Sequence, residues 1–313
     1  MTDLSKLKPL YMWAGGKNKM IPKYLDTPGI PLSGYDTFVE PFFGGGAMTV
    51  WMAQNNPSVK RFVINDFKSE LMGIYLSIQS DVTGFCARMD KLSSDFLPLD
   101  KPSRKSYFYN LRLEYTSDYA KWNSVEESAT LYFLMKTAFN GIWQVNQKDN
   151  PAGRFSTPCG LVNQKTKVYD KELVELWSEF LPNVEIHCGD WAAACNNENA
   201  FYFFDPPYRE SFTTYGAEFD DNEQLRLLDF CKLANDRGDK VFYCNRDDSN
   251  DGFFEANRGK LSVAHYDIKY TAGRRATETD GERTAKAAKE ILLYSNNIEK
   301  IDPLTATFPD LFS

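Results

Sequence analysis

The chain has 313 residues, of which 42% are hydrophobic and 15% aromatic, so we expect a packed globular protein with one domain and an inserted or appended second one. The net charge of −7 argues against a protein that coats nucleic acid, yet it permits a local basic face. The six cysteines form no Cys-x-x-Cys pair, and there are only two histidines, so disulfides and zinc or histidine-rich metal sites are not expected. The sequence has no apolar run of membrane length and no signal-peptide core, which argues against a membrane anchor and favours a cytoplasmic protein.

The first organised unit is a strand–helix–strand segment. We predict a strand at residues 37–39, a tight turn at the glycines 44–46, a helix at 47–54, and a second strand at 60–66 that ends in an acid. Two successive strands joined through a helix lie parallel in one sheet, so this unit predicts an α/β fold.

The middle of the chain has a different pattern. Apolar residues at helical spacing between Leu71 and Met89 predict one helix, and a capping box of Ser124 and Glu127 predicts the start of another. A stretch rich in Gly, Asn and Pro at 140–160 predicts a long loop or irregular hairpin. We therefore expect a mostly helical insertion at residues 70–183.

The alternating pattern resumes after the insertion. A helix is predicted at 222–236, and strands are predicted at 184–188, 201–204, 241–244, 261–268 and 291–294. Residues 1–69 and 184–313 are accordingly expected to form one wound α/β domain, which the helical residues 70–183 interrupt.

Two glycines and an acid suggest a ligand at one edge of this sheet. Gly44 and Gly46 would let a ligand approach the backbone closely, and Asp66 at the end of the next strand could accept hydrogen bonds from both ribose hydroxyls. Thr49 stands where a dinucleotide fingerprint has its third glycine, which disfavours a nicotinamide dehydrogenase. The pattern predicts a nucleoside-bearing ligand, with a plain turn and a surface acid as the alternatives.

Two residues that precede the first strand could border the same ligand. Trp13 would supply an apolar wall, and Lys17 would supply a cation for a carboxylate. An ordinary turn with a surface lysine is the alternative interpretation of this segment.

The sequence Asp205-Pro206-Pro207-Tyr208 directly follows a predicted strand. The prolines fix φ and have no N–H, so we expect backbone carbonyls that point outward without a partner. With the Asp205 carboxylate they would form a rigid set of acceptors beside the Tyr208 ring. This suits a planar substrate with an amino group, because the amine can donate while the ring stacks. A β-turn that begins at the aspartate is the alternative.

In this order, the motifs WAGGK, FVEPFFGGG, ND at 65–66 and DPPY at 205–208 resemble those of the Dam-type, D12-class DNA adenine-N6 methyltransferases. The similarity spans nearly the whole chain, and FNGIWQVN resembles the DNA-reading hairpin of that family. The resemblance implies a Rossmann-like, S-adenosylmethionine-dependent methyltransferase sheet with a helical target-recognition domain. It also implies a target adenine that is flipped out of double-stranded DNA, and a reaction without a metal ion.

The resemblance also implies roles for single residues. Hydrogen bonds from the adenine N6 to the Asp205 carboxylate and the Pro206 carbonyl would favour in-line attack on the sulfonium methyl group. Lys17 would lie near the methionine carboxylate of the donor, and Asp66 would hold the ribose. The residues expected to line the donor are Trp13, Gly15, Lys17, Glu40, Phe43, Gly44, Gly46, Asp66, Asp190, Trp191 and Asp205.

We expect the DNA contacts in the insertion and in a late loop. The candidates are Asn140, Ile142, Gln144, Arg104, Lys105, Arg274 and Arg275. Family members that read GATC commonly have a lysine at the position of Met12 and an arginine at that of Gln144. Lysine and arginine suit guanine, whereas glutamine suits adenine, so we expect a site other than GATC. We also expect the protein to bind DNA as a monomer.

Other functions stay open on the sequence. The same Asp-Pro-Pro-Tyr chemistry serves methylation of RNA adenine or of cytosine N4, and a non-catalytic DNA-binding relative is a further alternative. The pair Pro158-Cys159 would be the nucleophile of a cytosine-C5 enzyme, but it lies in the insertion before DPPY, so an ordinary loop cysteine is the preferred interpretation.

Overall fold

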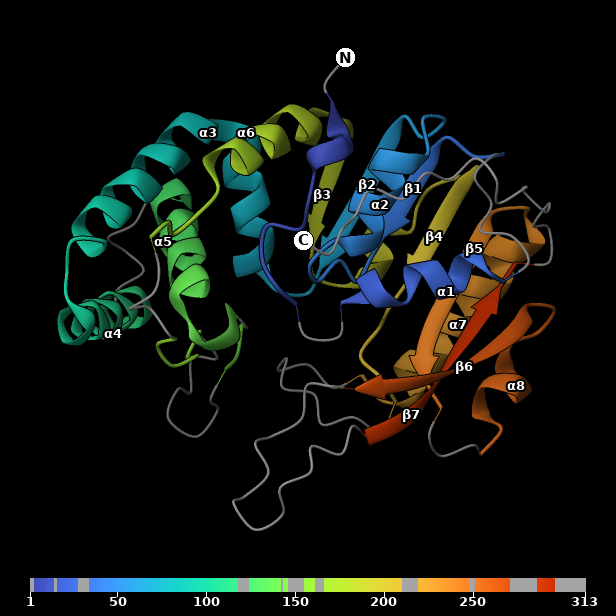
Figure 1. Cartoon of the computed structure of the whole chain (residues 1–313). Coiled ribbons are helices and arrows are strands. Elements are labelled where there is room, and N and C mark those ends of the chain that lie inside the picture. Colours follow the sequence, from blue (N-terminus) through green and yellow to red (C-terminus); the bar gives the residue numbers. More distant parts are fainter. Residues whose placement is uncertain are drawn as a thin grey trace, which may run out of the picture.

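A seven-stranded mixed sheet forms the centre of the protein (Figure 1). The computed structural model describes residues 3–13, 16–27, 34–117, 124–141, 143–145, 155–160, 166–209, 219–247, 251–270 and 286–295. In spatial order the sheet is β3-β2-β1-β4-β5-β7-β6. The strands are β1 (Thr37–Glu40), β2 (Arg61–Asp66), β3 (Val184–Cys188), β4 (Ala200–Phe204), β5 (Lys240–Arg246), β6 (Ser262–Tyr270) and β7 (Lys286–Tyr294). The predicted α/β class is confirmed.

The chain order reverses at the middle of the sheet. β1 pairs in parallel with both β2 and β4, and the chain then continues outward to β3 on one side and to β5 on the other. β7 inserts antiparallel between β5 and β6. In open parallel sheets a crevice opens at the carboxyl ends of the two strands where the order reverses, here β1 and β4.

Helices cover both faces of the sheet because alternate strand residues are apolar on both sides. One face, which includes Phe38, Phe62 and Phe201, packs against α2 (Ala47–Asn55), α3 (Ser69–Phe96) and α6 (Lys171–Phe180). The opposite face packs against α7 (Asp221–Asp236) and α8 (Phe253–Asn257). The short elements are η1 (Leu4–Lys6), η2 (Lys17–Lys19), α1 (Ile21–Leu25), η6 (Leu181–Asn183) and η7 (Trp191–Ala194).

The segment between β2 and β3 is helical, as predicted, and consists of α3, α4 (Lys101–Ser117), α5 (Ser124–Thr137) and α6, which lie at the β3 end of the sheet (Figure 1). Its core continues into that of the sheet: the Tyr75 and Trp177 rings lie 5.1 Å apart, and the Phe62 and Phe180 rings 4.9 Å apart. The division into two domains stays a prediction. None of the helices in the described ranges is both long and apolar enough to cross a membrane.

The predicted irregular hairpin follows α5 and η4 (Phe139–Gly141). Its base is closed by hydrogen bonds from the Phe139 N–H to the Pro158 carbonyl (2.8 Å) and from the Ser156 N–H to the Gln144 carbonyl (2.8 Å). The Arg112 guanidinium donates to the carbonyls of Ser156 and its neighbour, at 2.8 and 2.9 Å. The helical segment thus anchors both sides of the hairpin, whose middle lies outside the described residues.

Candidate active site

A cavity of about 920 Å³ opens at the carboxyl ends of β1, β2 and β4, where the strand order predicts a crevice. Segments that are far apart in the sequence line it: residues 40–47, 65–68, 189–191 and 205–208. An N-terminal segment that includes Met12, Trp13 and Lys17 also lines it. All the residues predicted to line the donor therefore meet in one cavity, except Gly15, which lies outside the described residues.

The glycine loop after β1 is shaped by two aromatic side chains. Gly44 and Gly46 have φ values of 50° and 70°, which side chains disfavour. A Cβ on Gly44 would lie 2.6 Å from the Trp13 indole nitrogen, and one on Gly46 would overlap the Phe43 ring. The Tyr11 hydroxyl donates to the Gly44 carbonyl at 3.0 Å. Trp13 therefore covers the loop as an apolar wall, and the loop has no room for side chains.

Asp66 fixes the same loop from the end of β2. Its two carboxylate oxygens accept the backbone N–H groups of Gly44 (2.9 Å) and Lys68 (3.0 Å). Burial raises the pKa of Asp66, and the backbone hydrogen bonds oppose that rise. Each oxygen retains a second lone pair, so the carboxylate can accept further hydrogen bonds from a ligand in the cavity.

Glu40, at the end of β1, holds the first turn of α2. Its carboxylate accepts hydrogen bonds from the Thr49 N–H (2.9 Å) and from the Thr49 hydroxyl. The side chain is buried, and burial raises its pKa to about 8. Glu40 was expected as a donor-lining residue, and it also caps the helix that begins at the glycine loop.

Lys17 lies against Asp205 instead of standing free for a ligand. Its ammonium donates to the Asp205 Oδ1 at 2.6 Å and to the Tyr208 hydroxyl at 2.6 Å, and it lies 4.0 Å from Glu290 Oε2. Only 3% of the Lys17 side chain is exposed, so the surface-lysine alternative is wrong. Burial would lower the pKa of Lys17, but the negative groups around it raise that pKa well above its ordinary value.

The DPPY segment is held from behind, which corrects one expectation. The Pro207 carbonyl is not free, because it accepts a hydrogen bond from the Gln224 amide at 2.9 Å. Arg209, which directly follows the DPPY segment, donates its backbone N–H to Asn245 Oδ1 at 3.0 Å, and the Asn245 amide in turn donates to Gln224 Oε1. No donor in the described ranges bonds the Pro206 carbonyl. Of the two proline carbonyls, that of Pro206 is therefore the one available to a substrate.

Asp190 and Trp191 line the cavity below β3. The Asp190 carboxylate caps η7 through the Ala192 N–H (2.8 Å) and accepts two hydrogen bonds from Arg226, at 2.8 and 2.9 Å. Those bonds lower the pKa of Asp190. Trp191 is buried, with the Arg226 guanidinium 4.7 Å from its ring. Asp190 is thus an ion-paired rim residue, and Trp191 forms part of the core beneath the cavity.

The predicted DNA-contacting residues fall into three groups. Lys105, Asn140 and Gln144 are exposed, whereas Ile142, Arg274 and Arg275 lie outside the described residues. The expectation that Arg104 contacts DNA is corrected, because this residue is buried, donates to the Leu97 carbonyl and stacks on the Phe96 ring at 5.2 Å. The cause is that Arg104 shares one face of α4 with the buried Phe108 and Leu111.

Several site residues were missed by the sequence reasoning. Tyr11, Gln224, Asn245 and Glu290 support the glycine loop, DPPY and Lys17. Tyr11 stands two residues before Trp13, where an apolar segment already indicated a cover for the ligand. The other three come from α7, β5 and β7, and no local pattern connects them to the site. Cys159 does not line the cavity, so the cytosine-C5 alternative gains no support.

The sheet and its cavity define a Rossmann-like α/β protein with a cavity at the switch between β1 and β4, the place where such folds bind ligands. The sequence profile of the family described as D12 class N6 adenine-specific DNA methyltransferase matches residues 13–275, and the chain belongs to this family.

Characterised relatives cover most of the chain. Type II methyltransferase M.MjaIII of Methanocaldococcus jannaschii is 31% identical over 305 residues, which cover 93% of this chain and 99% of that protein. Type II methyltransferase M1.LlaDCHI of Lactococcus lactis subsp. cremoris is 32% identical over 258 residues, covering 76% and 81%. Type II methyltransferase M.CviBI of Paramecium bursaria Chlorella virus NC1A is 30% identical over 235 residues, covering 74% and 81%.

These findings confirm the predicted family and activity. The protein is a site-specific DNA methyltransferase that modifies adenine at N6. Methylation of RNA or of cytosine is disfavoured, because the family is adenine-specific and acts on DNA.

Proposed function

We propose that the protein transfers the methyl group of S-adenosylmethionine to N6 of an adenine turned out of duplex DNA, at a site other than GATC. The observation that carries this assignment is the single cavity in which residues 205–208 face the glycine loop and Asp66. A base at DPPY and a donor over the glycine loop would share one space. The reacting atoms could therefore meet without a large rearrangement.

The residues of the cavity fit this methyl donor. Asp66 is a buried carboxylate with free lone pairs, which suits ribose hydroxyls. The glycine loop has backbone without side chains, and Trp13 provides an apolar wall above it. When bound, S-adenosylmethionine supplies an electrophilic methyl group on a positively charged sulfur.

The chain's own groups prepare the nucleophile. The N6 amine would donate its two hydrogens to the Asp205 carboxylate and the Pro206 carbonyl while the base stacks on Tyr208. As the new nitrogen–carbon bond forms, the methyl–sulfur bond would break with its electron pair on sulfur, and the methylated N6 would then release one proton to water. Preorganised acceptors stabilise the positive charge that develops on N6.

Lys17 receives a different role from the one expected by resemblance. Its ammonium lies 2.6 Å from Asp205, so we assign it to the acceptor carboxylate instead of the methionine carboxylate of the donor. Burial raises the pKa of Asp205, and the Lys17 cation opposes that rise. Lys17 therefore favours the ionised form of Asp205, in which both carboxylate oxygens accept hydrogen bonds, and it acts as a positioning residue.

The exposed residues of the hairpin and of the cavity rim support a target other than GATC. Gln144 is exposed on the hairpin, and its amide suits an adenine edge in the major groove. Met12 lines the cavity and is 70% exposed, so it can contact a thymine methyl group but cannot donate to guanine. Asn140 is exposed with a left-handed φ of 55°. We propose that the enzyme reads this site as a monomer.

The decisive test is transfer of labelled methyl groups from S-adenosylmethionine to duplex DNA that contains adenine. Asp205→Asn preserves the shape but removes the charge, so we expect transfer to fall by about 10²–10³-fold while donor binding persists. The exposed change Asp95→Asn on α3 is the matched control. Normal transfer by Asp205→Asn would refute the assignment of the acceptor, and a wild-type enzyme that labels no adenine in duplex DNA would refute the function.

The target site has its own test. Sequencing of methylated DNA should give one dominant site that differs from GATC, and Gln144→Arg should change the preference at one base pair. A site map that Gln144→Arg leaves unchanged would remove Gln144 from the residues that read DNA. Sedimentation of the enzyme with a short duplex tests the monomer, because a dimer would bind two protein chains per duplex.

A further inference from the structure

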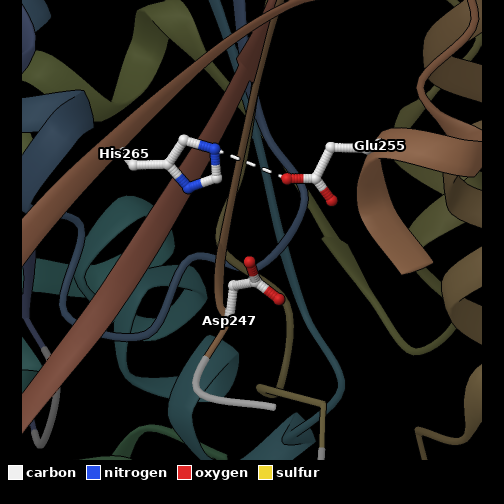
Figure 2. A group of neighbouring side chains, drawn as sticks. All are labelled: Asp247, Glu255 and His265. Carbon is white, nitrogen blue, oxygen red and sulfur yellow. Dashed lines mark ion pairs between the residues drawn. The ribbon is translucent and has the colours of Figure 1, made fainter. Parts of the chain in front are cut away.

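Three potential metal ligands converge near the carboxyl end of β5 (Figure 2). Asp247 directly follows β5, Glu255 lies in α8, and His265 lies in β6. One ligand atom of each residue lies within 4.8 Å of the other two. The Nε2 of His265 and the Oε1 of Glu255 are 3.4 Å apart. None of the three residues lines the active-site cavity.

Asp247 is the unusual member of this group. Only 1% of the residue is exposed, and its buried Oδ1 accepts no hydrogen bond from the residues that the structure describes. Its backbone is fixed, because its N–H donates to the Lys289 carbonyl at 3.0 Å. A buried carboxylate oxygen without a donor is costly, so such an atom indicates a missing partner. Figure 2 shows this carboxylate below the His265–Glu255 pair and pointing toward it.

We propose that Asp247, Glu255 and His265 bind one divalent transition-metal ion of the zinc class. One imidazole and two carboxylates form a mixed nitrogen and oxygen set that suits Zn²⁺, with a water molecule in the fourth position. Bonds of about 2.0–2.1 Å in a tetrahedral site place the ligand atoms roughly 3.4 Å from one another. The His265–Glu255 pair already has this separation.

The remaining contraction is sterically accessible. The side chains of His265 and Glu255 are 46% and 41% exposed, so both can move toward the buried Asp247. Burial raises the pKa of Asp247, repulsion from Glu255 and Asp251 adds to the rise, and His265 and Lys289 oppose it. His265 and Lys289 compensate the Asp247 charge only in part, whereas a bound cation would be a direct partner of the carboxylate.

The ion would stabilise the frame behind the active site without taking part in catalysis. Asp247 lies two residues after Asn245, which holds the backbone of Arg209 next to the DPPY segment. The metal would tie the end of β5 to α8 and β6. This inference does not rest on the proposed function, because the ligands and their geometry are independent of the substrate.

The test uses the full chain, freed of metal by a chelator and titrated with Zn²⁺ by calorimetry. We expect one binding site per chain and a rise in Tm that grows with Zn²⁺ concentration. His265→Ala and Asp247→Asn should each weaken binding by about 100-fold. The matched control is His187→Ala, since His187 also pairs with a glutamate, Glu185, at 2.6 Å but belongs to no cluster of three in the described residues.

A second readout guards against loss of the fold. Without metal, Asp247→Asn should be at least as stable as the wild type, because it removes a buried charge that is only partly compensated. With Zn²⁺, the wild type and His187→Ala should gain clearly more stability than Asp247→Asn. Absence of stoichiometric Zn²⁺ binding, or equal gains in Tm by the wild type and Asp247→Asn, would overturn the proposal and leave His265 and Glu255 as a surface ion pair.

Discussion

Glu40 offers a quantitative test of how burial controls the charges around the glycine loop. Its carboxylate is buried at the end of β1, with the Thr49 N–H and hydroxyl as donors. Burial raises its pKa from 4.5 to about 8. Glu40→Gln keeps the shape of the side chain and an oxygen that can accept the Thr49 N–H. The variant therefore removes the titration and little else.

The sign of the pH effect follows from the raised pKa. Between pH 4.5 and about 8 the folded protein holds a proton on Glu40 that the unfolded chain releases, so wild-type stability falls as pH rises through this window. At about 1.4 kcal/mol for each tenfold change in acidity, the full effect is up to about 5 kcal/mol. Repulsion from Asp205 and Asp66 contributes to the rise in pKa, so it acts in the same direction. Glu40→Gln should lose none of this stability.

The measurement is the free energy of unfolding in urea at several pH values from 5 to 9, without a methyl donor. We expect the difference between Glu40→Gln and the wild type to grow with pH and to level off above about pH 8. The exposed change Glu198→Gln is the matched control and should give no growing advantage. A difference between variant and wild type that stays constant across the range would refute the argument that burial raises the pKa of Glu40 in the folded protein.

Three further changes test other parts of the site. Lys17→Met leaves the buried Glu290 and the half-buried Asp205 without their cation, so it should cost about 3 kcal/mol in urea unfolding and slow methyl transfer; a stable, active variant would contradict this. In Gly34→Ala the new Cβ is disfavoured only by the positive φ, so the variant should lose about 1 kcal/mol of unfolding free energy. In Gly46→Ala the Cβ would also clash with the Phe43 ring, so the loss should be clearly larger; equal losses would show that the ring moves aside. Arg104→Ala should lower Tm but preserve DNA affinity. Lys105→Ala should preserve Tm but lower DNA affinity, and it should reduce the number of ions released on DNA binding, measured from the salt dependence, by about one.

Two strands could be predicted from the sequence for different reasons. The predicted range 201–204 differs from β4 by one residue, because an uninterrupted apolar run that is buried on both faces leaves little choice. The predicted range 184–188 coincides with β3, an edge strand in which apolar and polar residues alternate. The prediction was weakest for the antiparallel strand β7. β7 begins at Lys286, five residues before the predicted start, because its first half is polar and is held by antiparallel pairing with β6. Cross-strand hydrogen bonds decide such a boundary, and they have no local signature.

The assignment of Arg104 to DNA contact failed for a different reason, because the sequence already contained a signal for the burial of this residue. A run of basic residues suggested a DNA-binding face, but Arg104 stands four and seven residues before the buried Phe108 and Leu111. That spacing places it on the apolar face of α4. Helical periodicity should therefore be applied to charged residues as well as to apolar ones before a basic cluster is assigned to nucleic acid.

The arrangement around Lys17 could not be predicted, because it joins three distant parts of the chain. Lys17 reaches Asp205 after β4 and Glu290 in β7, and Tyr24 donates its hydroxyl to Glu290. One buried cation thus compensates two buried carboxylates, so their protonation is coupled. Burial raises the pKa of Glu290, and Lys17 opposes that rise, as it does at Asp205. The charge on Asp205, the proposed acceptor for N6, therefore depends on a residue in the antiparallel half of the sheet, and a pH–rate profile should report this group of three and not Asp205 by itself.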